Sequence, residues 1–297
     1  MCKGNSVTIL TYNLGLLKLQ PFGIGPATYE NPPFVNERFP HMAGNILTSD
    51  ADILVLQEVW RESHAKSLVE ALKGKYPYVV RSSLSSWWQL HNGLMLFSKF
   101  PITNYKLIKH AKAERIESIF GSKCMQVVEL STSMGPIMIV NMHATAGGID
   151  PESCNEIRES ELEEAMAECA AFSSRSPDHR GRAIIVGDLN MGPEESKSNY
   201  DFMVEKGYVD GVLQAATNDG NTMHTWDPKN ILNAEGVHSH CPSCRIDHLF
   251  FEQDSQFCVT EASLFMNEAF IPVMHRGKEK NVTLSDHYGV LMNLSVV

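Results

Sequence analysis

Short apolar runs, each about the length of one β-strand, recur along the whole chain. The first, residues 7–13, is rich in β-branched side chains, and residues 53–57 form a continuous apolar run typical of a buried strand. Comparable strand-like segments are predicted at 78–82, 93–97, 103–109, 123–131, 136–142, 183–187, 246–251 and 288–294. Helical spacing predicts helices at 36–48, 62–72, 156–172 and 194–206.

Strands outnumber helices, and no repeat, low-complexity tract or linker separates them. This pattern predicts one α/β domain over residues 1–297, with two packed sheets and outer helices. Pro40 constrains the first predicted helix, because proline is tolerated in the first turn and disrupts a helix interior. We therefore expect Pro40 to lie in the first turn of helix 36–48.

The composition is that of a globular protein. The 297 residues are 43% hydrophobic and 20% charged, which allows a large buried core. No apolar stretch approaches the ~20 residues that a membrane span requires. Residues 1–6 lead directly into the first strand-like run, which leaves no room for a signal peptide. We expect a cytoplasmic protein, with peripheral membrane contact left open, or the mature form of a secreted one.

Charge and cysteine content narrow the functional classes. The formal net charge is -10, and no Lys/Arg run supplies the basic face that nucleic-acid-binding proteins normally present. Cations can bridge two negative partners, so the charge disfavours a nuclease without excluding it. The seven cysteines are scattered and odd in number, which does not suggest a disulfide framework. Reduced thiols in a reducing compartment are the simpler expectation.

Polar residues stand where the apolar runs end. Asn13, Glu58 and His143 each close one run, and Asp188 and Asn190 follow another. Strand ends are where α/β folds place their ligands. If these ends meet, carboxylates, amides and imidazoles gather around one point.

Four carboxylates in this pattern suit a hard divalent cation: Glu58, Asp188, Asp247 and Asp286. Carboxylate oxygens are ligands of Mg²⁺, Mn²⁺ and Ca²⁺, and the set contains no cysteine that would indicate structural zinc. Taken singly, each motif is better explained as an ordinary turn, loop or helix start. Taken together, in this order and spacing, they favour a functional site.

Six motifs follow one another along the chain: Tyr12-Asn13-Leu14, Leu56-Gln57-Glu58-Val59-Trp60, Asn141-Met142-His143, Gly187-Asp188-Leu189-Asn190, Arg245-Ile246-Asp247-His248 and Ser285-Asp286-His287. Their order resembles the endonuclease/exonuclease/phosphatase superfamily, which includes deoxyribonucleases and neutral sphingomyelinases. The resemblance covers essentially the whole chain. It implies a deoxyribonuclease-like four-layer α/β sandwich, in which two mixed β-sheets pack face to face between helices.

Further details resemble the neutral sphingomyelinase branch: residues 50–60, 92–102, 143–148 and 285–290. This resemblance implies a metal-dependent phosphodiesterase that hydrolyses a phospholipid head group, such as that of sphingomyelin. One alternative is a deoxyribonuclease-like endonuclease, and a weaker one is an enzyme for a soluble phosphate monoester such as an inositol phosphate. A catalytically inactive binding module of the same fold is the third.

The resemblance also implies a role for each residue. Mg²⁺, with Mn²⁺ or Ca²⁺ as alternatives, would be held by Asn13, Glu58, Asp188 and Asp286. The residues implied in catalysis are His143, Asp188, Asn190, Asp247 and His287, in which His287 takes a proton from water and Asp247 orients His287. Phosphate oxygens would be bound by Asn92, His143 and Asn190. The oligomeric state stays open.

Four further features lie outside this set. Cys241-Pro242-Ser243-Cys244 has no second such pair to complete a zinc site, so incidental thiols or one local disulfide are the simpler interpretations. Trp87 and Trp88 are either a membrane-interface anchor or packing residues. His248, where many relatives have an aromatic residue, is expected to shape the pocket. Two long loops are expected to border the site, 15–38 and 217–244.

Overall fold

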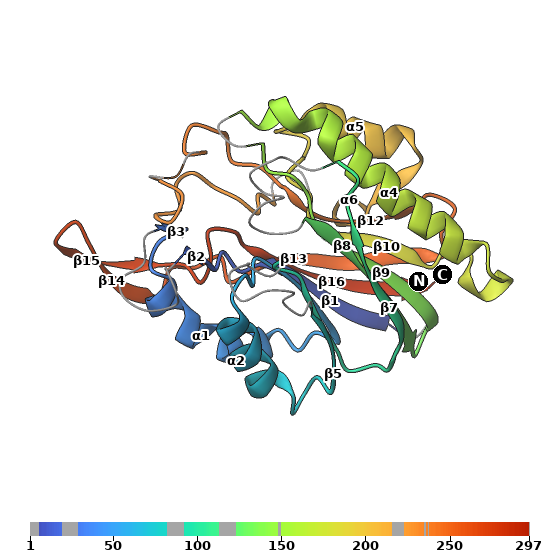
Figure 1. The fold of residues 1–297 in the computed structure, drawn as a ribbon, viewed down its shortest axis with the longest axis horizontal. Coiled ribbons are helices and arrows are strands. Elements are labelled where there is room, and N and C mark those ends of the chain that lie inside the picture. Colours follow the sequence, from blue (N-terminus) through green and yellow to red (C-terminus); the bar gives the residue numbers. More distant parts are fainter. Residues whose placement is uncertain are drawn as a thin grey trace.

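The computed structural model describes residues 6–19, 29–81, 92–112, 123–147, 150–215, 223–234, 236 and 238–296. Two six-stranded sheets pack face to face (Figure 1). The first sheet has the order β13 (Phe257–Phe265), β16 (Gly289–Val296), β1 (Ser6–Asn13), β4 (Ile53–Gln57), β6 (Met95–Ser98), β5 (Tyr78–Arg81). The second has the order β11 (Tyr208–Asp210), β12 (Asp247–Glu252), β10 (Ala183–Asp188), β9 (Gly135–His143), β8 (Cys124–Thr132), β7 (Ile102–Lys109).

Both sheets are mixed, and their central strands end at the same edge of the sandwich. β1 runs parallel to β4, and β9 runs parallel to β10 with His143 opposite Asp188. β16 is antiparallel to β1, and β12 is antiparallel to β10 with Asp188 opposite Asp247. The start of an antiparallel strand therefore lies beside the end of its neighbour. This topology confirms the predicted sandwich of two mixed sheets.

Helices cover both outer faces of the sandwich (Figure 1). The alternation of side chains along β4 explains this layering. Ile53 and Val55 belong to the core between the sheets, whereas Leu54 and Leu56 pack in the core that α1 and α2 cover. The second sheet packs in the same way against α4 and α5. The helices are α1 (Val35–Thr48), α2 (Glu62–Leu72), α4 (Asn155–Ser173), α5 (Lys197–Glu205), α6 (Gly211–Gln214), η2 (Pro151–Cys154) and η3 (Pro177–His179).

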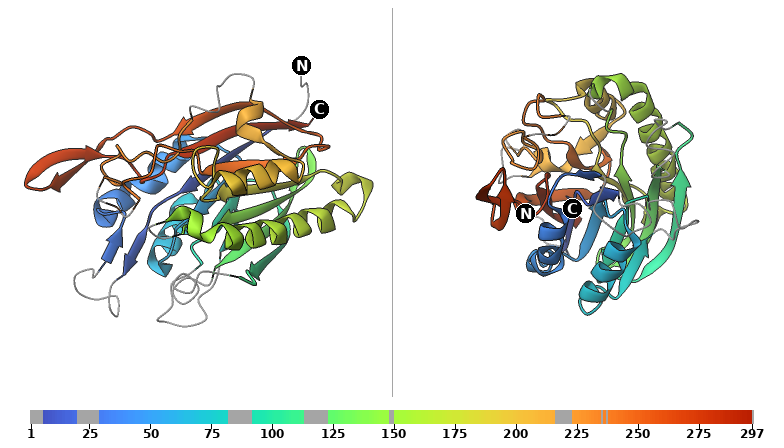
Figure 2. Two further views of the ribbon diagram at one scale, coloured as in Figure 1. Left: turned by 90° about the horizontal axis from the view of Figure 1, so that it is seen from above. Right: turned by 60° about the vertical axis from the view of Figure 1, so that its left-hand side comes forward.

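Two small hairpins complete the fold. The first joins β2 (Leu17–Leu19) to β3 (Tyr29–Asn31), and the second joins β14 (Ile271–His275) to β15 (Lys278–Val282). The second hairpin projects from the body of the sandwich (Figure 2). Among the helices that the structure describes, none has the length and apolar character needed to cross a bilayer.

The helix boundaries differ from the predicted ones in two instructive places. α1 begins at Val35, after a left-handed Phe34, so Pro40 lies in its second turn and the first-turn prediction is wrong. Burial of Met42 and Ile46 offsets the hydrogen bond that the proline removes. α5 begins only at Lys197, because the preceding residue is itself left-handed.

Six strands were absent from the predicted pattern: β2, β3, β11, β13, β14 and β15. β15 has the sequence Lys-Glu-Lys-Asn-Val and exposes all but its last residue, so no apolar run marks it. β13 buries only part of its side chains at the edge of the first sheet. Such strands are held by main-chain pairing with a neighbour, which a hydrophobic pattern does not report.

His64 makes the contact between α1 and α2 sensitive to pH. It is buried, stacks on Phe39 at 4.2 Å between ring centroids, and burial lowers its pKa to about 4. The unfolded chain therefore binds a proton at higher pH than the folded one, and stability falls as pH drops from about 6.5 towards 4. Between pH 7 and pH 4 the free energy of unfolding should fall in wild type by on the order of 3 kcal/mol more than in His64→Leu, which has no imidazole to protonate.

Denaturant unfolding at both pH values measures this difference, with the same substitution at the exposed His41 as the control. A His64→Leu stability difference that does not change with pH would contradict the argument.

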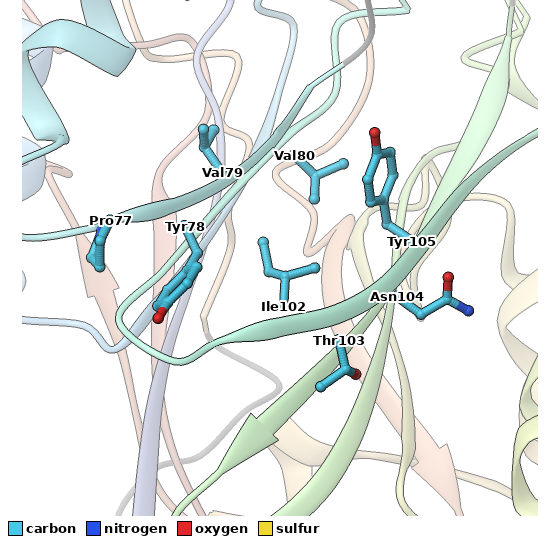
Figure 3. A pocket seen from close by; sticks show the side chains of 8 residues that line it. All are labelled: Pro77, Tyr78, Val79, Val80, Ile102, Thr103, Asn104 and Tyr105. Carbon is cyan, nitrogen blue, oxygen red and sulfur yellow. The ribbon is translucent and has the colours of Figure 1, made fainter.

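A surface groove of about 510 Å³ opens where the edge strands of the two sheets meet. Figure 3 shows its lining by β5, β7 and the preceding Pro77, with Tyr78 and Tyr105 on either side. None of the predicted site residues lines it. The groove lies at the edge strands β5 and β7, and the candidate chemistry lies elsewhere.

Candidate active site

The ends of β1, β4 and β10 bring an amide and two carboxylates into contact. The Asn13 amide nitrogen donates to Glu58 Oε1 at 3.1 Å and to Asp188 Oδ2 at 2.8 Å. Asn13 and Asp188 are fully buried, and 17% of the Glu58 side chain is exposed. One amide thus bridges two carboxylates from different sheets.

A histidine–aspartate pair stands next to this cluster. His287 Nδ1 lies 2.9 Å from Asp247 Oδ2, and His287 Nε2 lies 3.7 Å from Asp188 Oδ2. The segment before β12 holds both partners in place. Thr225 Oγ1 accepts a hydrogen bond from the Asp247 amide at 3.2 Å, and Trp226 pairs with His287 in an isolated antiparallel bridge.

His143 closes the cluster from the end of β9. Its Nε2 lies 3.6 Å from Asp188 Oδ2 and 3.9 Å from Glu58 Oε1. The buried ammonium of Lys123 donates to the His143 carbonyl at 2.9 Å and fixes the backbone there. Asn190 turns its amide to the Ala144 carbonyl, at 2.9 Å.

Two site residues leave their strands through left-handed backbone. Glu58 has a φ of 60° directly after β4, and Asn190 has a φ of 48° shortly after β10. Such conformations are uncommon for residues with a side chain, and they gather at functional sites. Here they turn the Glu58 carboxylate into the cluster and the Asn190 amide to the Ala144 carbonyl beside it.

Asp286 rests against a backbone that only glycine can supply. Gly15 has a φ of +53°, and a Cβ on it would lie 2.3 Å from Asp286 Oδ1. The Ser285 hydroxyl lies 2.8 Å from the Asn13 carbonyl oxygen and 3.0 Å from the same Oδ1. These contacts join the exit of β1 to the segment before β16.

Burial and like charge shift the proton equilibria of this cluster. Burial, together with the Asp286 carboxylate, raises the pKa of Glu58 to about 7, and burial raises the pKa of Asp188 to about 6. Burial lowers the pKa of His143 well below its ordinary value, and Lys123 adds to this effect. Burial alone would lower the pKa of His287, but Asp247 and Asp188 raise it well above 6.5.

The donor set suits a divalent cation. Ligand atoms of Asp188, Asp247 and His287 lie within 4.8 Å of one another. Glu58 stands beside this trio, because the Asn13 amide contacts both Glu58 and Asp188. The raised pKa values of the buried Glu58 and Asp188 carboxyls indicate negative charge that the neighbouring protein groups do not fully neutralise, and a bound cation would neutralise it. Within the described residues, Asp247 Oδ1 is also buried without a hydrogen-bond partner.

The predicted residues divide into those that the structure brings together and those that it does not. Asn13, Glu58, His143, Asp188, Asp247 and His287 form one connected cluster, and Asn190 and Asp286 adjoin it through Ala144 and Gly15. Asn92 is buried, and its amide donates to Cys124 Sγ at 2.7 Å. It precedes Gly93, which packs on Glu58, so it lies at the margin.

His248 does not shape the pocket, and that prediction is wrong. Its Nδ1 lies 3.2 Å from Asp210 Oδ2, and its Nε2 lies 2.9 Å from the Met191 carbonyl oxygen. Successive side chains point to opposite faces of a strand. Because Asp247 faces the site, His248 on the same strand faces the other way.

The remaining predictions fall on thiols and loops. Cys241 and Cys244 are both buried free thiols, not a disulfide. Trp87 and Trp88 lie outside the described residues, as do parts of both predicted loops. One residue of each predicted loop, Gly15 and Asn233, contacts Asp286, which agrees with the prediction that these loops border the site.

The residue pattern did not identify two side chains that touch the cluster. Trp60 donates its indole N–H to Glu58 Oε2 at 3.2 Å, and its ring centroid lies 6.0 Å from that of His143. The position of Trp60, two residues after Glu58 in the sequence, could have indicated this contact. Lys123 contacts the backbone of His143, and nothing in its local sequence indicates that role.

Residues 10–287 match the sequence model of the Endonuclease/Exonuclease/phosphatase family. Inositol phosphosphingolipids phospholipase C of Saccharomyces cerevisiae is 22% identical over 89% of this chain. Sphingomyelin phosphodiesterase 2 of Homo sapiens is 26% identical over 85% of it. The matched regions make up 57% and 59% of those two relatives, so the chain spans less than two thirds of the length of each.

Solved structures share the fold. Sphingomyelinase C from Streptomyces griseocarneus aligns with a TM-score of 0.73 over 97% of this chain and 99% of that one, at 20% identity. A beta toxin variant from Staphylococcus aureus, solved with bound magnesium ions, aligns with a TM-score of 0.71 over 99% and 100%, at 16% identity. At these identities the likeness establishes the architecture, and activity has to be argued from the site.

Proposed function

We propose that this chain, which belongs to the Endonuclease/Exonuclease/phosphatase family, is a metal-dependent phosphodiesterase that hydrolyses the head-group phosphodiester of a sphingolipid. The observation that carries the proposal is the His287–Asp247 pair, at 2.9 Å, facing the buried carboxylate of Asp188. A base oriented by a carboxylate, beside hard oxygen ligands, is what attack by water on a phosphodiester requires.

Asn13, Glu58, Asp188 and Asp286 are the residues that would hold the cation. Bound there, Mg²⁺ would neutralise charge that develops on the phosphate and would lower the pKa of His287 towards that of a general base. Mn²⁺ and Ca²⁺ suit the same oxygen ligands. Mg²⁺ is the first choice, because a few carboxylates suffice to hold it and leave positions for substrate oxygens.

The remaining chemistry belongs to the side chains. Nε2 of His287 takes a proton from water as the water oxygen bonds to phosphorus. The bond from phosphorus to the lipid oxygen breaks, that oxygen takes a proton from solvent water, and His287 then releases its own proton to solvent. Asp247 holds the imidazole and stabilises its protonated form. His143 and Asn190, with Asn92 at the margin, are placed to donate hydrogen bonds to phosphate oxygens. The products are a phosphorylated head group and a lipid alcohol.

The lipid substrate is supported by both relatives, whose names refer to sphingolipids. The net charge of -10 disfavours the nucleic-acid alternative. A lipid substrate also requires contact with a membrane surface, and we propose a peripheral one. We also propose that residues 1–297 act as one catalytic domain and that the protein is cytoplasmic.

Head-group release tests the proposal directly. We expect Mg²⁺-dependent release of phosphocholine from sphingomyelin vesicles, or of inositol phosphate from inositol phosphosphingolipid vesicles, and none in EDTA. Nicking of plasmid DNA runs in parallel. Nicking without lipid hydrolysis would move the substrate to nucleic acid, and inactivity towards all three with the cation bound would favour the inactive binding module.

A further inference from the structure

Arg38 is a fully buried arginine whose donors reach main-chain carbonyls on both sides of the site. From α1, its Nη1 donates to Leu14 at 3.2 Å and to Leu284 at 2.9 Å, and its Nη2 donates to Gly15. Burying a guanidinium is costly unless its N–H groups are satisfied. Here Nε donates to the Pro33 carbonyl at 3.0 Å, and the Nη groups also reach two segments that lie 270 positions apart in the sequence.

Those two segments carry the ligand oxygens of the proposed cation site. Leu14 and Gly15 directly follow Asn13, and Leu284 stands two residues before Asp286. Gly15 is also the surface on which the Asp286 carboxylate rests, because a Cβ there would overlap Oδ1 at 2.3 Å. Fixing the Gly15 carbonyl therefore fixes the position that the carboxylate can occupy.

Two buried asparagines also hold the segment that contains Asp286. Asn233 Nδ2 donates to the Asp286 carbonyl at 2.9 Å and to the Asp227 carbonyl at 3.0 Å. Asn230 Nδ2 lies 3.2 Å from the Ser285 carbonyl oxygen. The backbone of residues 284–286 is thus held by side chains from α1 and from the segment after Trp226.

We propose that Arg38, Asn230 and Asn233 are positioning residues that set the affinity of the site for a divalent cation, by fixing the Asp286 carboxylate beside Asn13. This inference rests on the proposed function, because it takes the cluster to be a cation site. Groups that orient the ligands of a metal change its affinity without touching the metal. Arginine is required because its rigid fork presents five N–H donors at separate points, whereas the three donors of a lysine ammonium leave from one nitrogen.

Direct binding of Mn²⁺, followed by the electron paramagnetic resonance signal of the free ion, tests this without substrate. Arg38→Lys and Asn233→Ala are each expected to weaken Mn²⁺ binding on the order of tenfold. The matched control is Arg158→Lys. Arg158 is an equally buried arginine in α4 that donates to the Thr145 carbonyl at 2.7 Å. It should bind Mn²⁺ within about twofold of wild type.

Circular dichroism shows whether each variant is folded. If Arg38→Lys does not fold, the inference is tested with Asn233→Ala. Wild-type affinity in every folded variant at 38 and 233 would overturn the inference and leave the proposed function standing. So would an equal loss in Arg158→Lys. A wild-type protein that binds no Mn²⁺ would overturn the metal-dependent function itself, and the inference with it.

Discussion

Replacing His287 with alanine should lower kcat for the lipid substrate by roughly 10³- to 10⁴-fold, which is the range for loss of a general base held by a carboxylate. Among the described residues, His287 is the only histidine that pairs with Asp247, at 2.9 Å, and its Nε2 faces Asp188. The loss should appear in kcat, because proton transfer belongs to the transition state. Steady-state hydrolysis with saturating Mg²⁺ measures it.

Asp247→Asn is the informative companion. It keeps the shape of the side chain but removes the charge that stabilises the imidazolium, so we expect a large kcat loss with little change in fold. The exposed His41→Ala is the control for general effects of removing an imidazole. If His287→Ala retains activity within about tenfold of wild type, another group is the base and the proposed mechanism is wrong.

Removing the cation should abolish activity and also destabilise the protein. Asp286 lies near enough to Glu58 to raise the pKa of that buried carboxyl, and Asp188 is buried beside them. A bound cation offsets this repulsion and stabilises the folded state by about 2.7 kcal/mol at a concentration of 100 times Kd. Thermal unfolding in EDTA and in graded Mg²⁺ should therefore show a rising Tm.

Glu58→Gln should separate the two effects of that carboxylate. In EDTA the variant is expected to unfold at a higher temperature than wild type, because a buried negative charge beside Asp286 has been removed. In Mg²⁺ it should gain little and should lose most activity. The exposed Glu70→Gln is the control, with wild-type behaviour in both conditions. A Glu58→Gln variant that Mg²⁺ stabilises as much as wild type would remove Glu58 from the proposed ligands.

Part of the site followed directly from local sequence. Asn13, Glu58, His143 and Asp188 each close an apolar run, and parallel neighbours end at one edge of a sheet. Local pattern therefore predicted both the sandwich and most of the cluster. It did not predict β13 or β15, because their positions depend on main-chain pairing with strands already in place.

The sequence by itself determined which residue types stand at the strand ends and in what order, because periodicity and strand length are local properties. Only the tertiary structure decided that His248 faces away from Asp247's side, and that Asp286 lies against Gly15. The contacts of Arg38 with the carbonyls of residues 14 and 284 are likewise visible only in the folded structure. Such contacts depend on strand register and on the packing of one layer against another, and no local pattern encodes a distance across 270 residues.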